Sequence, residues 1–502
     1  MKKKIFVTNT IVLTVTSIIA KLIGIVFRSY MAAKVGAEGL GIYGLVCSVY
    51  SFFSSFAVSG VSLAITQLVS DYFAKDQKQM ARSVFRRCLA IGFLVSLSLS
   101  FLLFYLSEFI SVNIFMDKRS ISSLKILSIG LPFLAFSACF RGYFYARQHI
   151  FQTASEQLVE QLFEIAIFAF LVMRIKPGDV EYACMTIVSG TVIAEAFSCL
   201  HSYLMYIFNF CKHKKNFKIY FPAVSLRKDK VLRKILKISI PNSTNSFVKT
   251  GLSAAKNIMI PIGLKEFGAS TEKSLADYGM IRGMVSPVIS FPAVLMSAFS
   301  NLLIPEISRS NAINDYASMG RIISKIIKFT LHFSIFFAGV FWFWAKFIGK
   351  WIYQSHECAI YISILAPIVP FAYLSGILES VLKGLNEQVR SLVYNFANSI
   401  VKVLLIFILL PIKGVIGLII MMFSSEFLYA ITMLFRVIKI TKLDLSFKND
   451  IVLPIVCMFI ACTFSNFVFS HMQLNYILIF FILFITSLTL YCTTLNLIKV
   501  LK

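Results

Sequence analysis

Long apolar stretches dominate this chain and restrict what it can fold into. Its 502 residues contain about fourteen stretches of about 20 mostly apolar residues, the length that an α-helix needs to cross the hydrocarbon core of a bilayer. Inside hydrocarbon every backbone polar group must find its partner within the span, so such segments fold as helices. We therefore expect an all-α polytopic membrane protein with about fourteen transmembrane helices.

Several of these spans contain prolines, which remove helical hydrogen bonds and can kink a helix. They are Pro132, Pro287, Pro292, Pro367 and Pro370.

The expected spans are residues 5–30, 40–68, 84–106, 122–145, 157–173, 183–209, 238–262, 277–304, 324–347, 358–382, 390–411, 413–435, 451–470 and 474–497.

The basic residues predict the topology. The formal net charge is +26, and most of the 49 Lys and Arg fall into cytoplasmic loops if both termini are cytoplasmic. Cytoplasmic loops of membrane proteins carry such an excess of Lys and Arg. Topology and attraction to anionic lipid therefore explain the charge, and we expect no nucleic-acid partner.

The longest loop divides the chain into halves that resemble each other. Val35-Gly36-Ala37 in the first half corresponds to Phe267-Gly268-Ala269 in the second. Six spans precede the loop, so matching segments have the same orientation and the repeat is parallel. We expect an N-terminal lobe of six helices at 1–210, a basic cytoplasmic linker at 211–237, a C-terminal lobe of six helices at 238–440 and two accessory helices at 451–498.

Cations within the spans are the strongest candidates for a substrate site. Lys21 and Arg28 are seven residues apart, as are Lys249 and Lys256, so each pair lies on one helix face. Each such charge costs about 2.5 to 3.5 kcal/mol when it faces lipid. We expect the two helices to line a cavity between the lobes that binds an anionic group, with Arg282 and Lys402 as further members. The alternatives are pairing with buried carboxylates, or extension of Arg28 to the membrane surface.

Carboxylates provide candidates for ion coupling. Glu156, Glu160 and Glu164 recur every four residues where the fifth span begins, and Glu160 and Glu164 are the candidate coupling residues. The alternative for Glu156 and Glu160 is a solvated helix end. Glu195, Glu379 and Glu426 are more isolated. The sequence shows no enzyme signature, no metal-ligand spacing and no motif for a cofactor, so we expect none of these.

Two parts of the chain resemble a known family. The first part comprises Ala20 to Gly24, Arg28, Gly36 to Tyr43 and Ser59 to Val61. The second comprises Tyr278-Gly279, Gly283-Met284, Pro287, Phe291-Pro292 and Ile304 to Ser308. In these segments the chain resembles stage V sporulation protein B and related polysaccharide flippases. They form one branch of the multidrug/oligosaccharidyl-lipid/polysaccharide exporter superfamily.

The resemblance implies a flippase in a bacterial cytoplasmic membrane. Its substrate would be an undecaprenyl-pyrophosphate-linked oligosaccharide or peptidoglycan precursor, used in cell-wall, spore-cortex or surface-polysaccharide synthesis. Lys21 and Arg28 match the basic residues of the family's first helix, and Lys402 beside Asn398 argues against a sodium site. Two alternatives stay open: a cation-coupled multidrug exporter, and a membrane scaffold that does not transport and recruits cell-wall enzymes.

Overall fold

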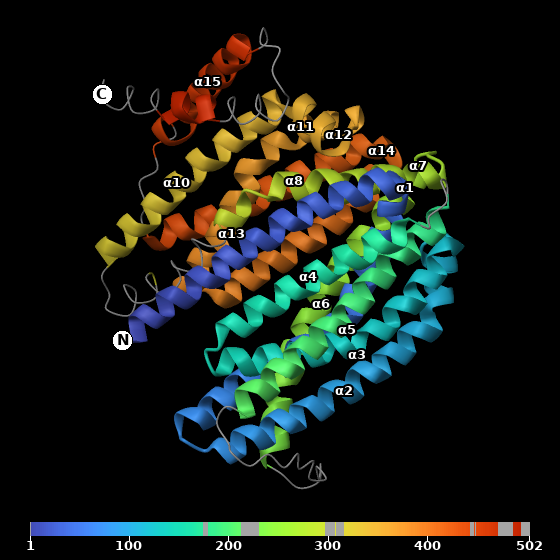
Figure 1. The fold of residues 1–502 in the computed structure, drawn as a ribbon. Coiled ribbons are helices and arrows are strands. Elements are labelled where there is room, and N and C mark those ends of the chain that lie inside the picture. Colours follow the sequence, from blue (N-terminus) through green and yellow to red (C-terminus); the bar gives the residue numbers. More distant parts are fainter. Residues whose placement is uncertain are drawn as a thin grey trace. The chain divides into compact units, whose positions relative to one another are not determined.

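The protein is built of helices (Figure 1). In this computed structural model the described residues are 2–173, 179–211, 230–296, 307, 316–441, 446, 448–469 and 485–492, and they contain no strand. The α-helices are α1 (Lys2–Ala74), α2 (Lys78–Phe109), α3 (Ile121–Ala146), α4 (Ile150–Val172), α5 (Val180–Cys211), α6 (Lys230–Glu266), α7 (Thr271–Gly279), α8 (Ser286–Ser290), α10 (Tyr316–Phe343), α11 (Ala345–Tyr353), α12 (His356–Leu365), α13 (Val369–Gly384), α14 (Gln388–Thr441) and α15 (Leu453–Phe469). Short π or 3-10 turns are η1 (Ile110–Ile114), η2 (Lys118–Ser120), η3 (Met280–Val285), η4 (Ala366–Ile368) and η5 (Lys448–Val452).

The all-helical membrane fold is confirmed. Among the described residues, eight helical segments are long and apolar enough to cross a membrane. Two of them join predicted spans: Val15–Ala74 covers most of the first and all of the second, and Gln388–Thr441 contains the eleventh and twelfth. The predicted fifth and seventh spans are helical as α4 and α6 but carry several charges. Most of the predicted fourteenth span, the end of the eighth and most of the basic linker lie outside the described residues.

Glycines bend the two longest helices. Within α1, Gly36 has φ 78° and ψ 173°, and within α14, Gly414 has φ 56° and ψ −132°. Side chains make such backbone conformations costly, so glycine is used. Gly268, the predicted counterpart of Gly36, also has a positive φ, 108°. The predicted turn near Pro411 therefore becomes a bend at Gly414.

Prolines interrupt other spans. The predicted tenth span is divided into α12, η4 and α13, with Pro367 inside the 3-10 turn and Pro370 in the first turn of α13. Pro287 lies in the first turn of α8, directly after the π turn η3. These are positions where the missing backbone N–H costs little. By contrast, α3 continues through Pro132.

The chain packs as two compact units. Unit 1 comprises Met1–Phe27, Lys34–Ile262 and Ser270–Gly279. Unit 2 comprises Arg28–Ala33, Gly263–Ala269 and Met280–Lys502. In unit 1, α3 packs against both α2 and α5, and α5 also packs against α4 (Figure 1). In unit 2, α13 packs against α10 and α14, and α15 packs against α10.

Contacts within unit 1 bring together loops that the predicted topology assigns to the same side. Arg119 forms an ion pair with Glu38 at 2.8 Å, and Ser122 donates to Glu181 at 3.0 Å. All four residues lie in or next to loops predicted to be external. At the other end of the helices, the Arg147 guanidinium lies over the Phe73 ring, 5.3 Å from its centroid, and both residues flank predicted cytoplasmic turns. The side of the membrane itself stays a prediction.

Candidate functional site

Lys21 lies on an exposed face of α1, beside a face that packs against α4. Phe27 is buried, and its ring makes an edge contact with Phe168 of α4, with the ring centroids 5.4 Å apart. One turn earlier, a Cβ atom at Gly24 would lie only 3.1 Å from Gln161 Nε2, so glycine allows this close approach. Lys21 is turned away from the buried contact and is exposed.

Polar side chains hold α6 against the second half of α1. Asn242 donates to the Ser59 carbonyl at 2.9 Å, and Asn257 donates to the Ser48 hydroxyl at the same distance. Such hydrogen bonds are typical of helix pairs in membranes. Of the predicted cations of this helix, Lys249 is exposed and Lys256 is half-buried. Asn242 and Asn257 therefore join α6 to α1.

Arg28 and Arg282 belong to unit 2. Arg28 is exposed and lies within electrostatic reach of Tyr353, while the next residue, Ser29, donates to the carbonyl of Ile352. Arg282 is exposed within the π turn η3. The six predicted cations are thus divided between the units: Lys21, Lys249 and Lys256 in unit 1, and Arg28, Arg282 and Lys402 in unit 2.

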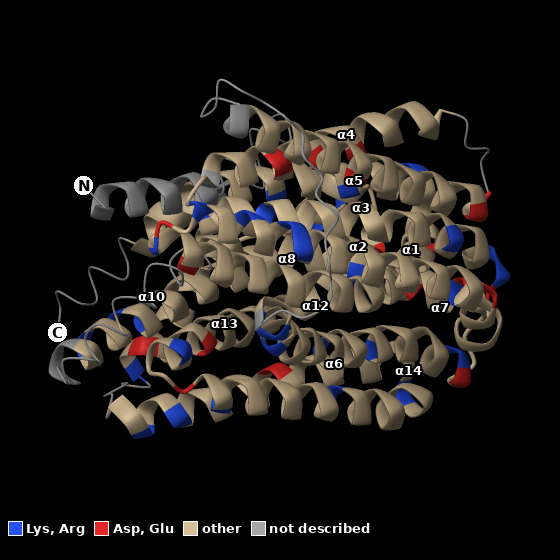
Figure 2. Ribbon diagram, turned by 90° about the horizontal axis from the view of Figure 1, so that it is seen from below, with Lys and Arg blue, Asp and Glu red and all other residues tan. Residues whose placement is uncertain are grey.

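Four of the six predicted cations form no ion pair with any described carboxylate. They are Lys21, Arg28, Lys249 and Arg282. Charged positions are sparse along the apolar helices (Figure 2). Lys402 differs, because its ammonium group lies 2.6 Å from Glu426 Oε1. For Lys402 the alternative of pairing with a carboxylate is therefore correct.

Carboxyl groups gather inside unit 1. Glu156 of α4 is fully buried and accepts a hydrogen bond from Arg141 of α3 at 2.9 Å. Glu160 lies 4.0 Å from the same guanidinium and accepts from Ser198 of α5 at 3.3 Å. The predicted row of glutamates therefore faces neighbouring helices, and Glu156 is not a solvated helix end.

The cluster continues towards Glu195, whose role the sequence did not indicate. Thr191 donates to Glu164 at 2.9 Å, one turn before Glu195 on α5. Glu195 is buried and accepts from the Tyr50 hydroxyl at 2.7 Å. A Cβ atom at Gly130 of α3 would lie 2.6 Å from Glu195 Oε2, so the absent side chain makes room for this pair.

The carboxyl cluster is not built as a metal site. Within the described part of the chain, no group of three His, Cys, Asp or Glu side chains is arranged to hold a metal ion. The cluster instead combines four glutamates with one arginine, two hydroxyl-bearing side chains of α5 and one tyrosine. We define the carboxyl cluster as Glu156, Glu160, Glu164, Glu195, Arg141, Thr191, Ser198 and Tyr50.

Helices that cross a membrane, with charges held inside them, define this chain as a multi-pass membrane protein of the transporter type. The sequence model of the family described as "Polysaccharide biosynthesis protein" matches residues 6–248, and the MatE model matches residues 268–408. The chain belongs to the multidrug/oligosaccharidyl-lipid/polysaccharide exporter superfamily.

Relatives from Bacillus subtilis (strain 168) agree with this assignment. The chain is 23% identical to stage V sporulation protein B over 468 residues, which cover 92% of this chain and 89% of that protein. It is also 25% identical to the lipid II flippase MurJ over 187 residues, which cover 35% of this chain and 34% of that protein.

Solved structures of the superfamily share the fold. A lipid II flippase MurJ in an inward closed conformation has a TM-score of 0.70 at 16% identity, covering 98% of this chain and 100% of that chain. An inward-facing multidrug resistance MATE family transporter has a TM-score of 0.67 at 13% identity, covering 84% of this chain and 95% of that chain.

Proposed function

We propose that the protein is a flippase of lipid-linked glycans. It would move an undecaprenyl-pyrophosphate-linked oligosaccharide or peptidoglycan precursor across the bacterial cytoplasmic membrane by alternating access, in cell-wall, spore-cortex or surface-polysaccharide synthesis. The similarity to stage V sporulation protein B and to the lipid II flippase supports this substrate class. The glycan itself is left open.

The observation that carries the proposal is the presence of exposed, unpaired cations on apolar helices. Lys21 and Lys249 are exposed, and neither forms an ion pair with a described carboxylate. An exposed ammonium group on such a helix is costly in lipid but binds phosphate through charge-assisted hydrogen bonds. Arg28, Lys256 and Arg282 are the further candidates for binding the pyrophosphate.

Reconstituted transport tests the proposal. Purified full-length protein in lipid vesicles should move a fluorescent undecaprenyl-pyrophosphate glycan to the opposite leaflet. Because one charge-assisted hydrogen bond contributes about 1.5 to 3 kcal/mol, Lys21→Gln and Lys249→Gln should each slow transport about tenfold or more. Lys346→Gln, which removes an exposed lysine of α11, is the matched control and should transport normally. Full activity in both of the first two variants would exclude the proposed role of these lysines.

For the driving ion we propose the proton. If Glu156 and Glu160 were both ionised, two negative charges would share the one guanidinium group of Arg141. Buried charge without a partner is costly, so in this proposal a carboxyl group of the cluster is where a proton is held. Glu160 is about one-third exposed and is the entry point in this proposal, with Glu164 and the buried Glu195 further along the cluster. In the same vesicles, Glu195→Gln should abolish the response of transport to an imposed pH gradient.

A multidrug exporter is the second candidate function. The MatE match over residues 268–408 and the likeness to MATE structures favour it. Such an exporter would take cationic drugs, which the exposed lysines of unit 1 would repel. Cells that express the protein should therefore gain no resistance to cationic dyes, and clear resistance would favour this function over the first.

A further inference from the structure

Arginines and aromatic rings meet at one end of unit 1. The Arg147 guanidinium lies 5.3 Å from the Phe73 ring centroid and 5.9 Å from that of Tyr143. It also donates to the Tyr143 hydroxyl, with a donor to acceptor distance of 3.5 Å. Stacking of this kind fixes the plane of a guanidinium group and leaves its outer N–H groups available to a ligand.

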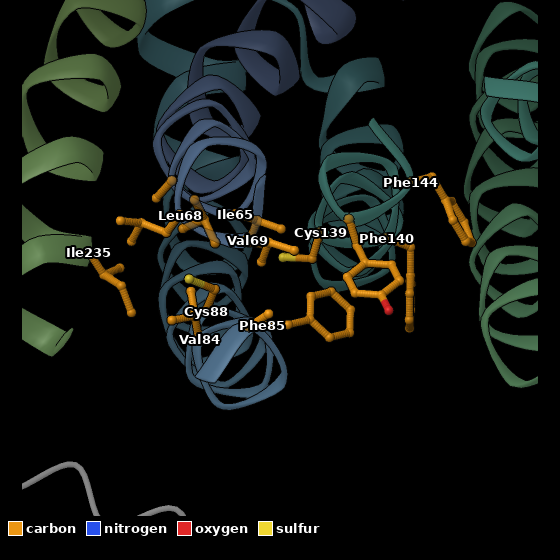
Figure 3. Packing of buried hydrophobic residues seen from close by; sticks show 14 residues of the cluster. Ile65, Leu68, Val69, Val84, Phe85, Cys88, Cys139, Phe140, Phe144 and Ile235 are labelled. Atoms are coloured by element: carbon orange, nitrogen blue, oxygen red, sulfur yellow. The ribbon is translucent and has the colours of Figure 1, made fainter. Parts of the chain in front are cut away.

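Tyr206 of α5 is the centre of this arrangement. Its ring makes an edge contact with Tyr143, with centroids 5.1 Å apart, and lies 5.3 Å from the ring of Phe85. Phe85 and Tyr143 belong to the hydrophobic cluster of Figure 3, and Tyr206 packs against this cluster. The phenol oxygen of Tyr206 lies within electrostatic reach of Arg82, Arg86 and Arg147. The Tyr206 ring therefore contacts both Phe85, which precedes Arg86 in the chain, and Tyr143, over whose ring Arg147 lies.

Two of these three arginines, Arg86 and Arg147, have no carboxylate partner among the described residues. Asp76 is exposed and pairs with Lys78 at 3.2 Å, and Asp71 is also exposed. In the described ranges neither Arg86 nor Arg147 lies within 4.0 Å of a carboxylate oxygen. A guanidinium group without a carboxylate partner attracts an anion, and phosphate matches the fork of its N–H groups.

Apolar side chains next to the arginines point to a lipid as the source of the phosphate. Tyr203, Leu204 and Phe208 surround Tyr206 in the sequence of α5 and are 40%, 42% and 67% exposed. A ligand that meets both surfaces has an anionic head and a hydrocarbon tail. The predicted topology also puts this end of unit 1 at the cytoplasmic leaflet, where anionic lipids attract basic residues.

We propose that Arg86 and Arg147, together with the Tyr206 hydroxyl, bind the phosphate of an anionic phospholipid, whose acyl chains lie along α5. None of these residues belongs to the candidate substrate cations or to the carboxyl cluster. The lipid site is therefore independent of the proposed transport function.

Lipid retention measured by native mass spectrometry tests this site. The full-length protein would be purified in detergent and titrated with phosphatidylglycerol, with phosphatidylcholine in parallel. Wild-type protein should retain phosphatidylglycerol preferentially. Arg86→Gln and Arg147→Gln should each weaken this binding about tenfold, because each removes charge-assisted hydrogen bonds to phosphate. Arg233→Gln, which removes an exposed arginine near the start of α6, is the matched control and should bind as the wild type does.

Three results would overturn the proposal. They are unchanged phosphatidylglycerol binding in both variants, equal loss in Arg233→Gln, and competition by inorganic phosphate at the concentration of the lipid headgroup, which would indicate a site for the free ion. Arg147 also packs on Phe73, so its variant could fail to fold. In that case Tyr206→Phe, which keeps the ring and removes only the hydroxyl, provides the test. Unchanged phosphatidylglycerol binding in both the Tyr206→Phe and the Arg86→Gln variants would contradict the proposal.

Discussion

At the scale of single residues, the missing side chain at Gly130 determines whether Glu195 and Tyr50 can meet. A methyl group there would lie 2.6 Å from Glu195 Oε2 and 3.0 Å from the Tyr50 hydroxyl. The pair would have to separate, leaving a buried carboxyl group and a buried hydroxyl without their hydrogen bond. We expect Gly130→Ala to lower stability by about 1 to 3 kcal/mol, measured as a lower midpoint of thermal unfolding in detergent.

Gly376 supplies the matched control for this prediction. It also lies within a helix, α13, but a Cβ atom there would meet nothing within 4 Å. Alanine is preferred over glycine in helices by about 1 kcal/mol, so Gly376→Ala should leave the unfolding midpoint unchanged or raise it. Equal destabilisation by both substitutions would mean that helix packing in general, and not the Glu195 pair, is responsible.

The sequence predicted part of the candidate site. The spacing of Glu156, Glu160 and Glu164 was enough to predict one helix face, because helical periodicity is local. The hydrogen bond between Tyr50 and Glu195 joins residues 145 positions apart, and no local pattern indicates such a pair. The available signal was Glu195 itself, a carboxyl group near the middle of a predicted span, with no indication of its partner.

At the scale of elements, Gly36 permits the bend within α1. Its φ of 78° and ψ of 173° lie in a region that only glycine occupies readily, and a Cβ atom there would touch nothing within 4 Å. A side chain at Gly36 would therefore strain only the backbone, and this strain should lower the free energy of unfolding by about 1 to 3 kcal/mol. Gly36→Ala should lower the unfolding midpoint by a corresponding amount, and an unchanged midpoint would show that the bend tolerates a side chain.

Element type was predictable here, whereas element boundaries were less so. The apolar stretches predicted helices because hydrocarbon allows little else. Whether two adjoining spans form one bent helix or two helices depends on how neighbouring helices pack around Gly36 and Gly414. The π turn over Met280–Val285 likewise follows no local signal that the sequence displays.

At the scale of the whole molecule, the predicted topology has both ends of the chain in the cytoplasm. Lys118 and Gln148 are exposed, at opposite ends of the α3 segment. In intact cells a membrane-impermeant maleimide should label Lys118→Cys, and it should label Gln148→Cys only after permeabilisation. The unsubstituted chain, which contains 10 cysteines, gives the background. The reverse pattern would invert the topology and place the proposed lipid site in the outer leaflet.

The way in which chain segments are divided between the two units has a consequence for how the protein could have evolved. Residues 238–262 and 270–279 belong to unit 1 although they follow the basic loop, and Arg28–Ala33 belong to unit 2 although they precede it. A gene fragment that ends in that loop therefore encodes neither interior completely. If the halves descend from one duplicated ancestor, that ancestor could build a full interior only by exchanging segments with a second copy of itself. Fusion into one chain would then make this exchange permanent.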